Sequence, residues 1–339
     1  MRNDMNKSRR FHARLAAGAA ASLAIAAVTA GYALAQSRSI PVGTGVVVIE
    51  TNLAYQGGRA AGTGMVLSSS GEVLTNNHVI RGATTIRVVV PGTGRSYLAK
   101  VVGYDVTDDV AVLQASGASN LKKVALGTST GLRVGQLVKA VGNAGGTGTL
   151  VKATGQVTGL SQTITVNDDT GGTATLRSLI EISAALQPGD SGGPLFNTAG
   201  KVIGMDSAAS TQSAYQDIAT IDGYAIPINR ALTIAKQIAA GTASGTVHIG
   251  ATAFLGIAVA EAQQGAAVAS VVPGSPADST RLTPGDVITA IDGTKVTSSA
   301  SMSRIIRSKK PGSSISVSYL DGAGTHRTLR VTLVSGPPQ

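Results

Sequence analysis

Residues 186–195 read LQPGDSGGPL, a glycine-rich segment that contains the pattern Gly-x-Ser-x-Gly around Ser191. Two interpretations are open at this point. Gly, Pro, Asp and Ser dominate turns, so the segment fits an ordinary turn between two strands. It also fits a loop that holds Ser191 for attack on a carbonyl group. Serine is a weak nucleophile unless a base takes its proton, so the choice depends on a histidine elsewhere in the chain.

The histidines of the chain narrow the choice of base to one residue. His12 lies in the N-terminal segment, His248 in a stretch of linker type and His326 in the last predicted hairpin. His78 alone lies within the large β-rich region, in VLTNNHVI (73–80), directly after a predicted strand. An isolated histidine there is usually a structural residue at a strand end, but beside a serine nucleophile it is the candidate general base.

An acid that holds the imidazole in the correct tautomer is the next requirement. The stretch YDVTDDVAVLQ (104–114) offers Asp105, Asp108 and Asp109. Asp109 directly precedes an apolar run that draws it toward the interior, where a carboxylate needs a partner. Asp105 and Asp108 fit turn positions better. Asp109 is therefore the candidate acid.

The segment around Ser191 can also supply an oxyanion hole. Pro188-Gly189 favours a turn with positive φ at the glycine, which aims the N–H groups of Gly189 and Ser191 at one point. The same motif could be the nucleophile elbow of a lipase or esterase with the α/β-hydrolase fold. That fold needs the order Ser, acid, His, whereas the order here is His, Asp, Ser in a helix-poor region, so this alternative is disfavoured.

Short β-strand patterns fill the region from Val46 to Ile228. Aromatic residues make up only 3% of the 339 residues and glycines number 43, which favours short strands and tight turns over helix bundles. The pattern predicts a sandwich or barrel. The strand-like runs are VVVIET (46–51), TTIRVVV (84–90), VAVLQ (110–114), QLVKAVG (136–142), SLIEIS (178–183) and KVIGM (201–205).

A helix and a second β-rich unit are predicted after this region. Asn229 is a suitable N-cap and Gly241 can end the helix. Its apolar stripe is Leu232, Ala235, Ile238 and Ala239. GTASGTVHIG (241–250) is a small-residue, polar stretch of linker type. The second unit contains the predicted strands AAVASVV (266–272) and DVITAID (286–292), a helical stretch around Met302 and a closing hairpin at Asp321-Gly322.

Residues 1–35 are typical of an export signal. A basic head precedes an Ala-rich apolar run from Leu15 to Ala35, and Ala33-Leu34-Ala35 has the form of a cleavage site. An uncleaved membrane anchor is the alternative. Removal of this segment takes away five basic residues and one acidic residue, so the formal net charge falls from +10 to +6. The remaining basic residues form no stripe, which gives no support for nucleic-acid binding.

Several classes of chemistry have no support in the sequence. The absence of cysteine excludes disulfides, thiol catalysis and Cys-ligated zinc. GNAGGTG (142–148) lacks the spacing of a nucleotide loop and is predicted to be a turn. Asn167-Asp168-Asp169 lacks the periodic ligands of a calcium loop. No cofactor and no metal are expected.

Together these residues resemble the HtrA/DegP family of exported bacterial serine proteases, and the small Gly-rich and Ala-rich form is most similar to secreted actinobacterial members. The resemblance covers Val46 to about Val334. It rests on GTGMVLSSSGEVLTNNHVI (62–80), DDVAVLQ (108–114), AVGNAGG (140–146), LQPGDSGGPLFNTAGKVIGM (186–205) and GYAIPINRAL (223–232). It implies a mainly β chain: a chymotrypsin/trypsin-like double six-stranded β-barrel over 41–240, a linker over 241–251 and a small α+β PDZ domain over 252–335.

The resemblance assigns roles to individual residues. It implies that His78 is the catalytic base, Asp109 its orienting acid and Ser191 the nucleophile, with Gly189 and Ser191 as oxyanion donors. It implies a specificity pocket that favours small aliphatic residues, formed by Ala185, Leu186, Met205, Asp206 and Ser207. An inward-turned Asp206 would instead favour Arg or Lys. Many family members have Asn before the serine where this chain has Asp190, which is expected to be solvated or paired with a basic side chain.

The PDZ domain implies peptide ligands. By resemblance, Leu255, Gly256 and Ile257 bind a peptide C-terminus, with Ile257, Met302 and Ile306 beneath its last side chain. The expected substrates are unfolded proteins or peptides, in envelope protein quality control. The competing hypothesis is a chaperone-like module that acts through the PDZ domain. Tyr55 is the only aromatic residue between the predicted cleavage site and His78, and the sequence leaves open whether the chains form a homo-oligomer.

Overall fold

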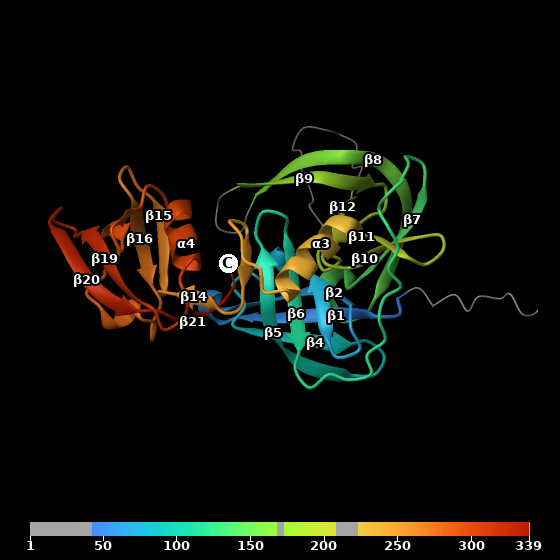
Figure 1. Ribbon diagram of the computed structural model, residues 1–339, viewed down its shortest axis with the longest axis horizontal. Helices are drawn as coiled ribbons and strands as arrows, with labels where there is room; N and C mark the ends of the chain where they lie inside the picture. The colour runs from blue at the N-terminus through green and yellow to red at the C-terminus, as the bar shows by residue number, and fades with distance from the viewer. Residues whose placement is uncertain (1–42, 168–172, 208–222, 339) are drawn as a thin grey trace, which may run out of the picture. The chain divides into compact units, whose positions relative to one another are not determined.

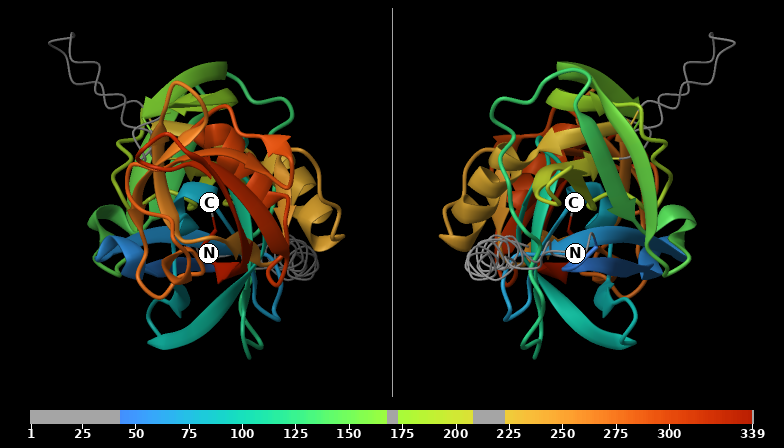
Figure 2. Two further views of the ribbon diagram at one scale, coloured as in Figure 1. Left: turned by 90° about the vertical axis from the view of Figure 1, so that its left-hand side faces the viewer. Right: turned by 90° about the vertical axis from the view of Figure 1, so that its right-hand side faces the viewer.

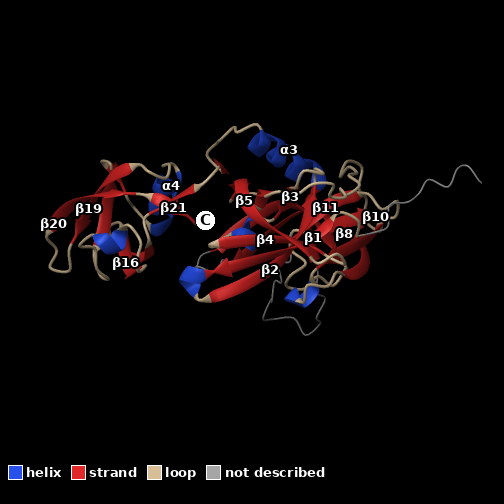
Figure 3. Cartoon of the chain, turned by 90° about the horizontal axis from the view of Figure 1, so that it is seen from below, coloured by secondary structure: helices blue, strands red, loops and turns tan. Residues whose placement is uncertain are grey.

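The computed structural model describes residues 43–167, 173–207 and 223–338. The predicted export signal and the Asp168-Asp169 pair lie outside these ranges. Strands dominate the described chain, and helices are few and short (Figure 3). Within the described ranges, no helix has both the length and the apolar character that a membrane crossing requires.

The first six strands form a closed antiparallel barrel (Figure 1). The strand order is β5-β4-β1-β2-β3-β6, and the pairing of β5 with β6 closes the ring. A short 3-10 helix at Ala54–Gln56 connects the first two strands. The strands are β1 (Val46–Leu53), β2 (Gly58–Val66), β3 (Glu72–Thr75), β4 (Thr85–Val90), β5 (Arg95–Asp105) and β6 (Val110–Ala115).

The next six strands form a second closed antiparallel barrel, in the order β10-β11-β12-β9-β8-β7. The register between β8 and β9 shifts three times, which bends this long hairpin around the barrel. The predicted double six-stranded barrel is confirmed. The strands are β7 (Leu137–Gly142), β8 (Val151–Asn167), β9 (Thr173–Ile182), β10 (Pro194–Asn197), β11 (Val202–Ser207) and β12 (Gly223–Pro227).

The helix α3 (Ile228–Ala239) follows the second barrel and packs against β5, β6 and β11 (Figures 1 and 2). The predicted N-cap, Asn229, is wrong, because Pro227 occupies that position and Asn229 lies inside the helix. The Asn229 amide instead donates to the hydroxyls of Thr128 and Thr130, a tertiary contact that local propensity does not reveal. Gly241, with φ of +69°, follows the helix end as predicted.

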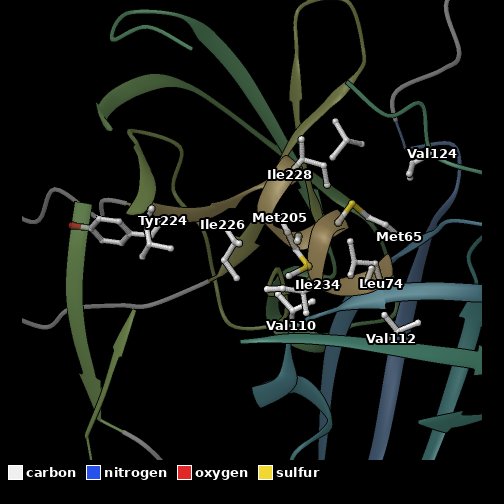
Figure 4. Packing of buried hydrophobic residues seen from close by; sticks show 14 of the residues in the cluster. Met65, Leu74, Val110, Val112, Val124, Met205, Tyr224, Ile226, Ile228 and Ile234 are labelled. Atoms are coloured by element: carbon white, nitrogen blue, oxygen red, sulfur yellow. The ribbon is translucent and has the colours of Figure 1, made fainter. Parts of the chain in front are cut away.

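The buried face of α3 also differs from the predicted stripe. Ala235 and Ile238 are buried as expected, but Ala231 and Ile234 are buried too, and Ala239 is exposed. These side chains join a hydrophobic cluster that includes residues of both barrels (Figure 4). The cluster connects the barrels through one continuous core, which includes Met65, Leu74 and Val112 of the first barrel and Met205 and Ile226 of the second.

Part of the predicted linker is a strand. β13 (Val247–Ile249) pairs antiparallel with residues 103–105 of β5. Val247 is buried in the cluster that connects the barrels, and Ile249 packs against that cluster. The apolar residues at 247 and 249 alternate with His248, a period that suits a strand on the edge of a sheet.

The C-terminal residues form a small α+β unit. Two sheets, β14–β21 and one built from β15 to β20, enclose a core with α4, whose first turn carries a capping box of Ser298 and Ser301. The elements are β14 (Thr252–Phe254), β15 (Ile257–Glu261), β16 (Ala266–Val271), a 3-10 helix (Ala277–Ser279), β17 (Val287–Ile291), β18 (Thr294–Lys295), α4 (Ser299–Arg307), β19 (Ser314–Leu320), β20 (His326–Thr332) and β21 (Val334–Gly336).

Candidate active site

His78 lies in a single helical turn, α2 (Asn77–Ile80), that directly follows β3. Its neighbours Asn77, Val79 and Ile80 are buried, so the turn is fixed to the first barrel. The His78 side chain is 38% exposed. The local sequence therefore anchors the turn by its apolar residues and presents the imidazole at the surface.

Asp109 holds His78 through two hydrogen bonds. Its Oδ2 lies 2.7 Å from His78 Nδ1, and its Oδ1 accepts the His78 backbone N–H at 2.9 Å. The Asp109 backbone has φ of +54°, and its carbonyl accepts from Asn76 Nδ2 at 2.9 Å. The Ser207 hydroxyl donates to the same Oδ2 at 3.3 Å. A carboxylate at Nδ1 places the imidazole proton there and leaves Nε2 to act as a base.

The two neighbouring acids serve other purposes, as their turn-like setting predicted. Asp105 Oδ1 accepts the backbone N–H groups of Thr107 and Asp108 and so closes a local turn. Asp108 forms an ion pair with Arg230 of α3. Of the three acids, Asp109 is the one that the structure places in hydrogen-bond contact with His78.

Ser191 comes from the second barrel and lies next to β2 of the first. Its carbonyl accepts the Thr63 N–H at 2.8 Å. A Cβ atom added at Gly62 would lie 2.6 Å from Val79 Cγ1 and 3.3 Å from the Ser191 carbonyl oxygen, so Gly62 separates the serine from the turn that carries His78. The backbone after the serine is held by a hydrogen bond of 2.8 Å from the Gly192 N–H to the Asp206 carbonyl. The two barrels thus bring the predicted base, acid and nucleophile to their common boundary.

The loop before Ser191 has the conformation that an oxyanion hole requires. Gly189 has φ of +101°, and a Cβ atom there would lie 2.2 Å from the Asn143 carbonyl oxygen, so only glycine fits. The preceding carbonyl, that of Pro188, accepts the Gly145 N–H at 2.8 Å. Within the described part of the chain, the Gly189 N–H has no hydrogen-bond acceptor. It can therefore donate to a bound ligand.

Asp190 is buried, and the expectation that it is solvated is wrong. The residue is 4% exposed, and its carboxyl Oδ2 accepts the Gln187 N–H at 2.9 Å. No ion pair joins it to a basic side chain in the described ranges. Burial raises the pKa of Asp190, and the Gln187 hydrogen bond offsets part of this effect.

A second buried acid, Asp206, lies in β11 in the electrostatic field of Asp190. It is fully buried, and neither carboxyl oxygen has a hydrogen-bond partner among the described residues. Burial, and then the charge of Asp190, raise the pKa of Asp206 well above its ordinary value. The uncharged acid is therefore favoured, and an uncharged acid does not attract Arg or Lys as a carboxylate would.

This environment leads to a prediction about stability and pH. Because the pKa of Asp206 is higher in the folded protein than in the unfolded chain, stability falls as the pH rises through the interval between the two values. The variant Asp206→Asn does not titrate. Each tenfold difference in proton affinity between the folded and unfolded states changes the free energy of unfolding by about 1.4 kcal/mol. The wild-type protein should therefore lose more Tm between pH 5 and pH 9 than Asp206→Asn, by roughly 3 °C or more.

Differential scanning fluorimetry on both proteins at these pH values measures the effect. Asp321→Asn is the control, because hydrogen bonds from Thr325 and Arg327 lower the pKa of this exposed group instead. Equal losses of Tm in the wild-type protein and Asp206→Asn would contradict the prediction.

The residues predicted for the specificity pocket differ in their burial. Ala185 is exposed, whereas Leu186 is buried in the core of the second barrel. Met205 is fully buried in the cluster between the barrels, so its predicted place in the pocket wall is wrong (Figure 4). The cause is the closed barrel, in which β11 is buried along its whole length. Ser207 contacts Asp109.

The residues predicted for the PDZ groove gather around one core. Leu255, Met302 and Ile306 are buried in the same hydrophobic cluster, and Ile257 packs against it. Gly256 has φ of +88°, and a Cβ atom there would lie 2.0 Å from Ser275 Cβ. This position accepts only glycine, as a tight loop between β14 and β15 requires.

Sequence reasoning missed several residues that contact the site. Asn76 holds Asp109, whereas Thr63, Asn143 and Gly145 hold the loop around Gly189. Ser207 was predicted for the specificity pocket, but its hydrogen bond to Asp109 was not. These residues belong to strands and turns of ordinary composition. GNAGGTG (142–148) is the turn that was predicted, with a 3-10 helix at Ala144–Gly146, but its contact with the nucleophile loop has no signal in the sequence.

Comparison with protein families gives two matches. Residues 62–205 match the family described as the trypsin-like peptidase domain, and residues 253–333 match the PDZ domain. Among solved structures, the HtrA-type protease AlgW with tripeptide is similar, with a TM-score of 0.50 and 29% sequence identity. The match covers 91% of this chain and 97% of that one.

Curated relatives include proteases from bacteria and plants. The chain is 35% identical to "Serine protease PepD" of Mycobacterium tuberculosis, a match that covers 85% of this chain and 63% of the relative. It is 34% identical to "Putative serine protease HhoA" of Synechocystis, over 81% and 67%. It is 32% identical to "Protease Do-like 1, chloroplastic" of Arabidopsis thaliana, over 90% and 73%. The chain thus spans less than two thirds of the mycobacterial relative.

Proposed function

Because the chain belongs to the HtrA/DegP family of trypsin-like serine proteases with a PDZ domain, we propose that it is an exported serine endopeptidase that cleaves unfolded or misfolded proteins. The observation that carries this proposal is the hydrogen bond of 2.7 Å between His78 Nδ1 and Asp109 Oδ2. The turn that contains His78 lies beside the Ser191 loop. This geometry supports a serine nucleophile activated by a base.

In the proposed reaction, Ser191 Oγ attacks the carbonyl carbon of the scissile peptide bond. His78 Nε2 takes the hydroxyl proton as the bond forms, and later gives it to the leaving amine as the C–N bond breaks. Asp109 stays ionised and stabilises the imidazolium. Water then attacks the acyl-enzyme by the same route, which releases the new carboxylate and restores the serine.

The tetrahedral intermediate carries a negative oxygen that needs hydrogen-bond donors. We assign this role to the N–H groups of Gly189 and Ser191. The positive φ of Gly189 and the lack of an acceptor for its N–H within the described chain support the assignment. Such donors act where charge develops, and one of them typically contributes about 10²–10³-fold in kcat.

We propose that the residue before the cleaved bond is a small aliphatic one: Val, Ala, Leu or Ile. An alanine at 185 offers no charge to Arg or Lys. The burial of Asp206, which favours its uncharged form, supports the same preference. Ala185 and Leu186 remain the proposed pocket residues, with Ser207 at the wall that also contacts Asp109.

The PDZ domain is proposed to bind the C-termini of substrates or regulatory peptides. Its ligand loop would be Leu255-Gly256-Ile257, with Met302 and Ile306 of α4 below the last side chain. The peptide in the AlgW structure belongs to that protein, and it supports the proposal by analogy. Residues 1–35 are proposed to direct export, and envelope protein quality control is the proposed setting.

Digestion of casein by the mature protein tests both the activity and its specificity. Because casein is unfolded, its peptide bonds can enter the site, and mass spectrometry of the fragments identifies each cut. We expect most cuts after Val, Ala, Leu or Ile. Intact casein would contradict the protease proposal and favour the chaperone-like alternative. Cuts mainly after Arg and Lys that disappear in Asp206→Ala would instead contradict the proposed pocket.

A further inference from the structure

Thr63 is a fully buried residue of β2 whose hydroxyl and backbone N–H are directed at the second barrel. Its hydroxyl donates to the Gly189 carbonyl at 2.7 Å, across 126 positions of sequence. The same hydroxyl accepts the Asn143 N–H at 2.9 Å. A backbone N–H can only donate and a carbonyl can only accept, so the direction of both hydrogen bonds follows from the chemistry.

These bonds restrain the peptide groups on both sides of Gly189. The Gly189 carbonyl accepts the Thr63 hydroxyl. The Pro188 carbonyl, which precedes the Gly189 N–H in the chain, accepts the Gly145 N–H at 2.8 Å. Because a trans peptide is planar, a fixed Pro188 carbonyl holds the Gly189 N–H in the opposite direction. Glycine itself tolerates either sign of φ, so the restraint must come from these partners.

Thr63 also acts on the hydrogen bond that holds the Pro188 carbonyl, through the turn at Asn143–Gly148. Its hydroxyl fixes the Asn143 N–H, and the Asn143 side-chain Oδ1 in turn accepts the Gly148 N–H at 2.7 Å. The Gly145 N–H that holds Pro188 belongs to this turn. The Thr63 backbone adds a third link, since its N–H donates to the Ser191 carbonyl. One buried residue of the first barrel thus connects the predicted oxyanion donors of the second.

We propose that Thr63 is a positioning residue, whose hydroxyl holds the Gly189 N–H in the orientation that binds the oxyanion. The proposal rests on the proposed protease function. It predicts that loss of the hydroxyl weakens binding of the transition state more than binding of the ground state, because the oxyanion exists only after attack. Loss of one oxyanion donor costs about 10²–10³-fold in kcat, which sets the upper limit of the effect.

The test compares Thr63→Val, which keeps the branched shape and removes the hydroxyl, with Thr63→Ser, which keeps the hydroxyl. We expect kcat on a peptide substrate to fall at least about tenfold in Thr63→Val, but by no more than the loss of a whole oxyanion donor would cause. KM should stay nearly unchanged. Thr63→Ser should largely keep the wild-type activity. Affinity for a peptidyl trifluoromethyl ketone, whose adduct with serine carries an oxyanion, should fall in parallel. Thr51→Val is the matched control, because Thr51 is a buried residue of the same barrel whose hydroxyl also donates to a carbonyl, that of Ala60.

The outcomes separate this proposal from the one on which it rests. A wild-type protein that cleaves no peptide overturns the protease function itself. An active wild-type protein with unchanged kcat and ketone affinity in Thr63→Val overturns the role of Thr63 alone, as does an equal loss in Thr51→Val. If Thr63→Val does not fold, Thr63→Cys serves instead, because a thiol is a weak donor. Activity of Thr63→Cys equal to that of Thr63→Ser would then overturn the proposal.

Discussion

Replacement of Ser191 by alanine is expected to lower kcat for peptide hydrolysis by about 10⁴-fold or more, because nucleophile and base act as a unit. The side chain loses one oxygen and keeps its Cβ, so the loop fixed by the Gly192 and Gly193 N–H groups should not move. His78→Ala should cause a similar loss. The measurements are steady-state kinetics on a peptide substrate and labelling with a fluorophosphonate probe, which should modify the wild-type protein only.

The matched control for this loss is Ser183→Ala. Ser183 is an exposed serine that precedes the same loop, and its hydroxyl accepts the Gln156 N–H at 3.1 Å. Its replacement should leave both peptide hydrolysis and probe labelling close to wild type. Probe labelling that persists in Ser191→Ala at the wild-type rate would show that another residue is the nucleophile.

Asp109→Asn is expected to lower kcat by about 10⁴-fold while the fold is kept. The backbone N–H of His78 can only donate, so the amide oxygen of the new side chain should take the position of Asp109 Oδ1. The amide NH₂ then faces His78 Nδ1, and the imidazole proton is forced onto Nε2. A histidine in this tautomer cannot accept the proton of Ser191. The backbone should tolerate the change, because asparagine readily adopts the positive φ of +54° found here.

Kinetics and thermal unfolding together measure this effect: kcat should fall, KM should change little, and Tm should stay close to wild type. Asp108→Asn is the control, since Asp108 is the adjacent carboxylate and pairs with Arg230 instead of His78. An Asp109→Asn protein with near-normal kcat would remove Asp109 from the proposed mechanism, whereas an equal loss in both variants would point to a general effect of charge.

The sequence predicted those parts of the site that follow from residue chemistry. Only one histidine lies in the large β-rich region, and only one nearby acid precedes an apolar run, so the sequence alone pairs His78 with Asp109, as their hydrogen bond does in the structure. The strands could be predicted because their apolar runs are bounded by glycine-rich turns. The structure differs from these predictions mainly at the ends of elements, such as the start of α3, where the tertiary contacts of Asn229 compete with local propensity.

The parts that could not be predicted depend on contacts between distant segments. Thr63 is an ordinary strand residue until Gly189 is brought to it from 126 positions away. Asp190 was expected to need solvent or a cation, because the sequence does not reveal that the Gln187 N–H and a closed barrel surround it. The strand at Val247–Ile249 resembled a linker, because its partner β5 lies more than a hundred residues earlier.

The division of the site between two barrels has a consequence for how the molecule is made. Synthesis proceeds from the N-terminus and domains generally fold as units, so the barrel with His78 and Asp109 can close before residues near Ser191 have been added. In the proposed mechanism, such a nascent chain holds a base with no hydroxyl to activate. The proposed mechanism therefore predicts that proteolysis begins only when the later barrel docks and β2 meets the serine loop. Immature copies should then be unable to digest unfolded chains around them during biosynthesis.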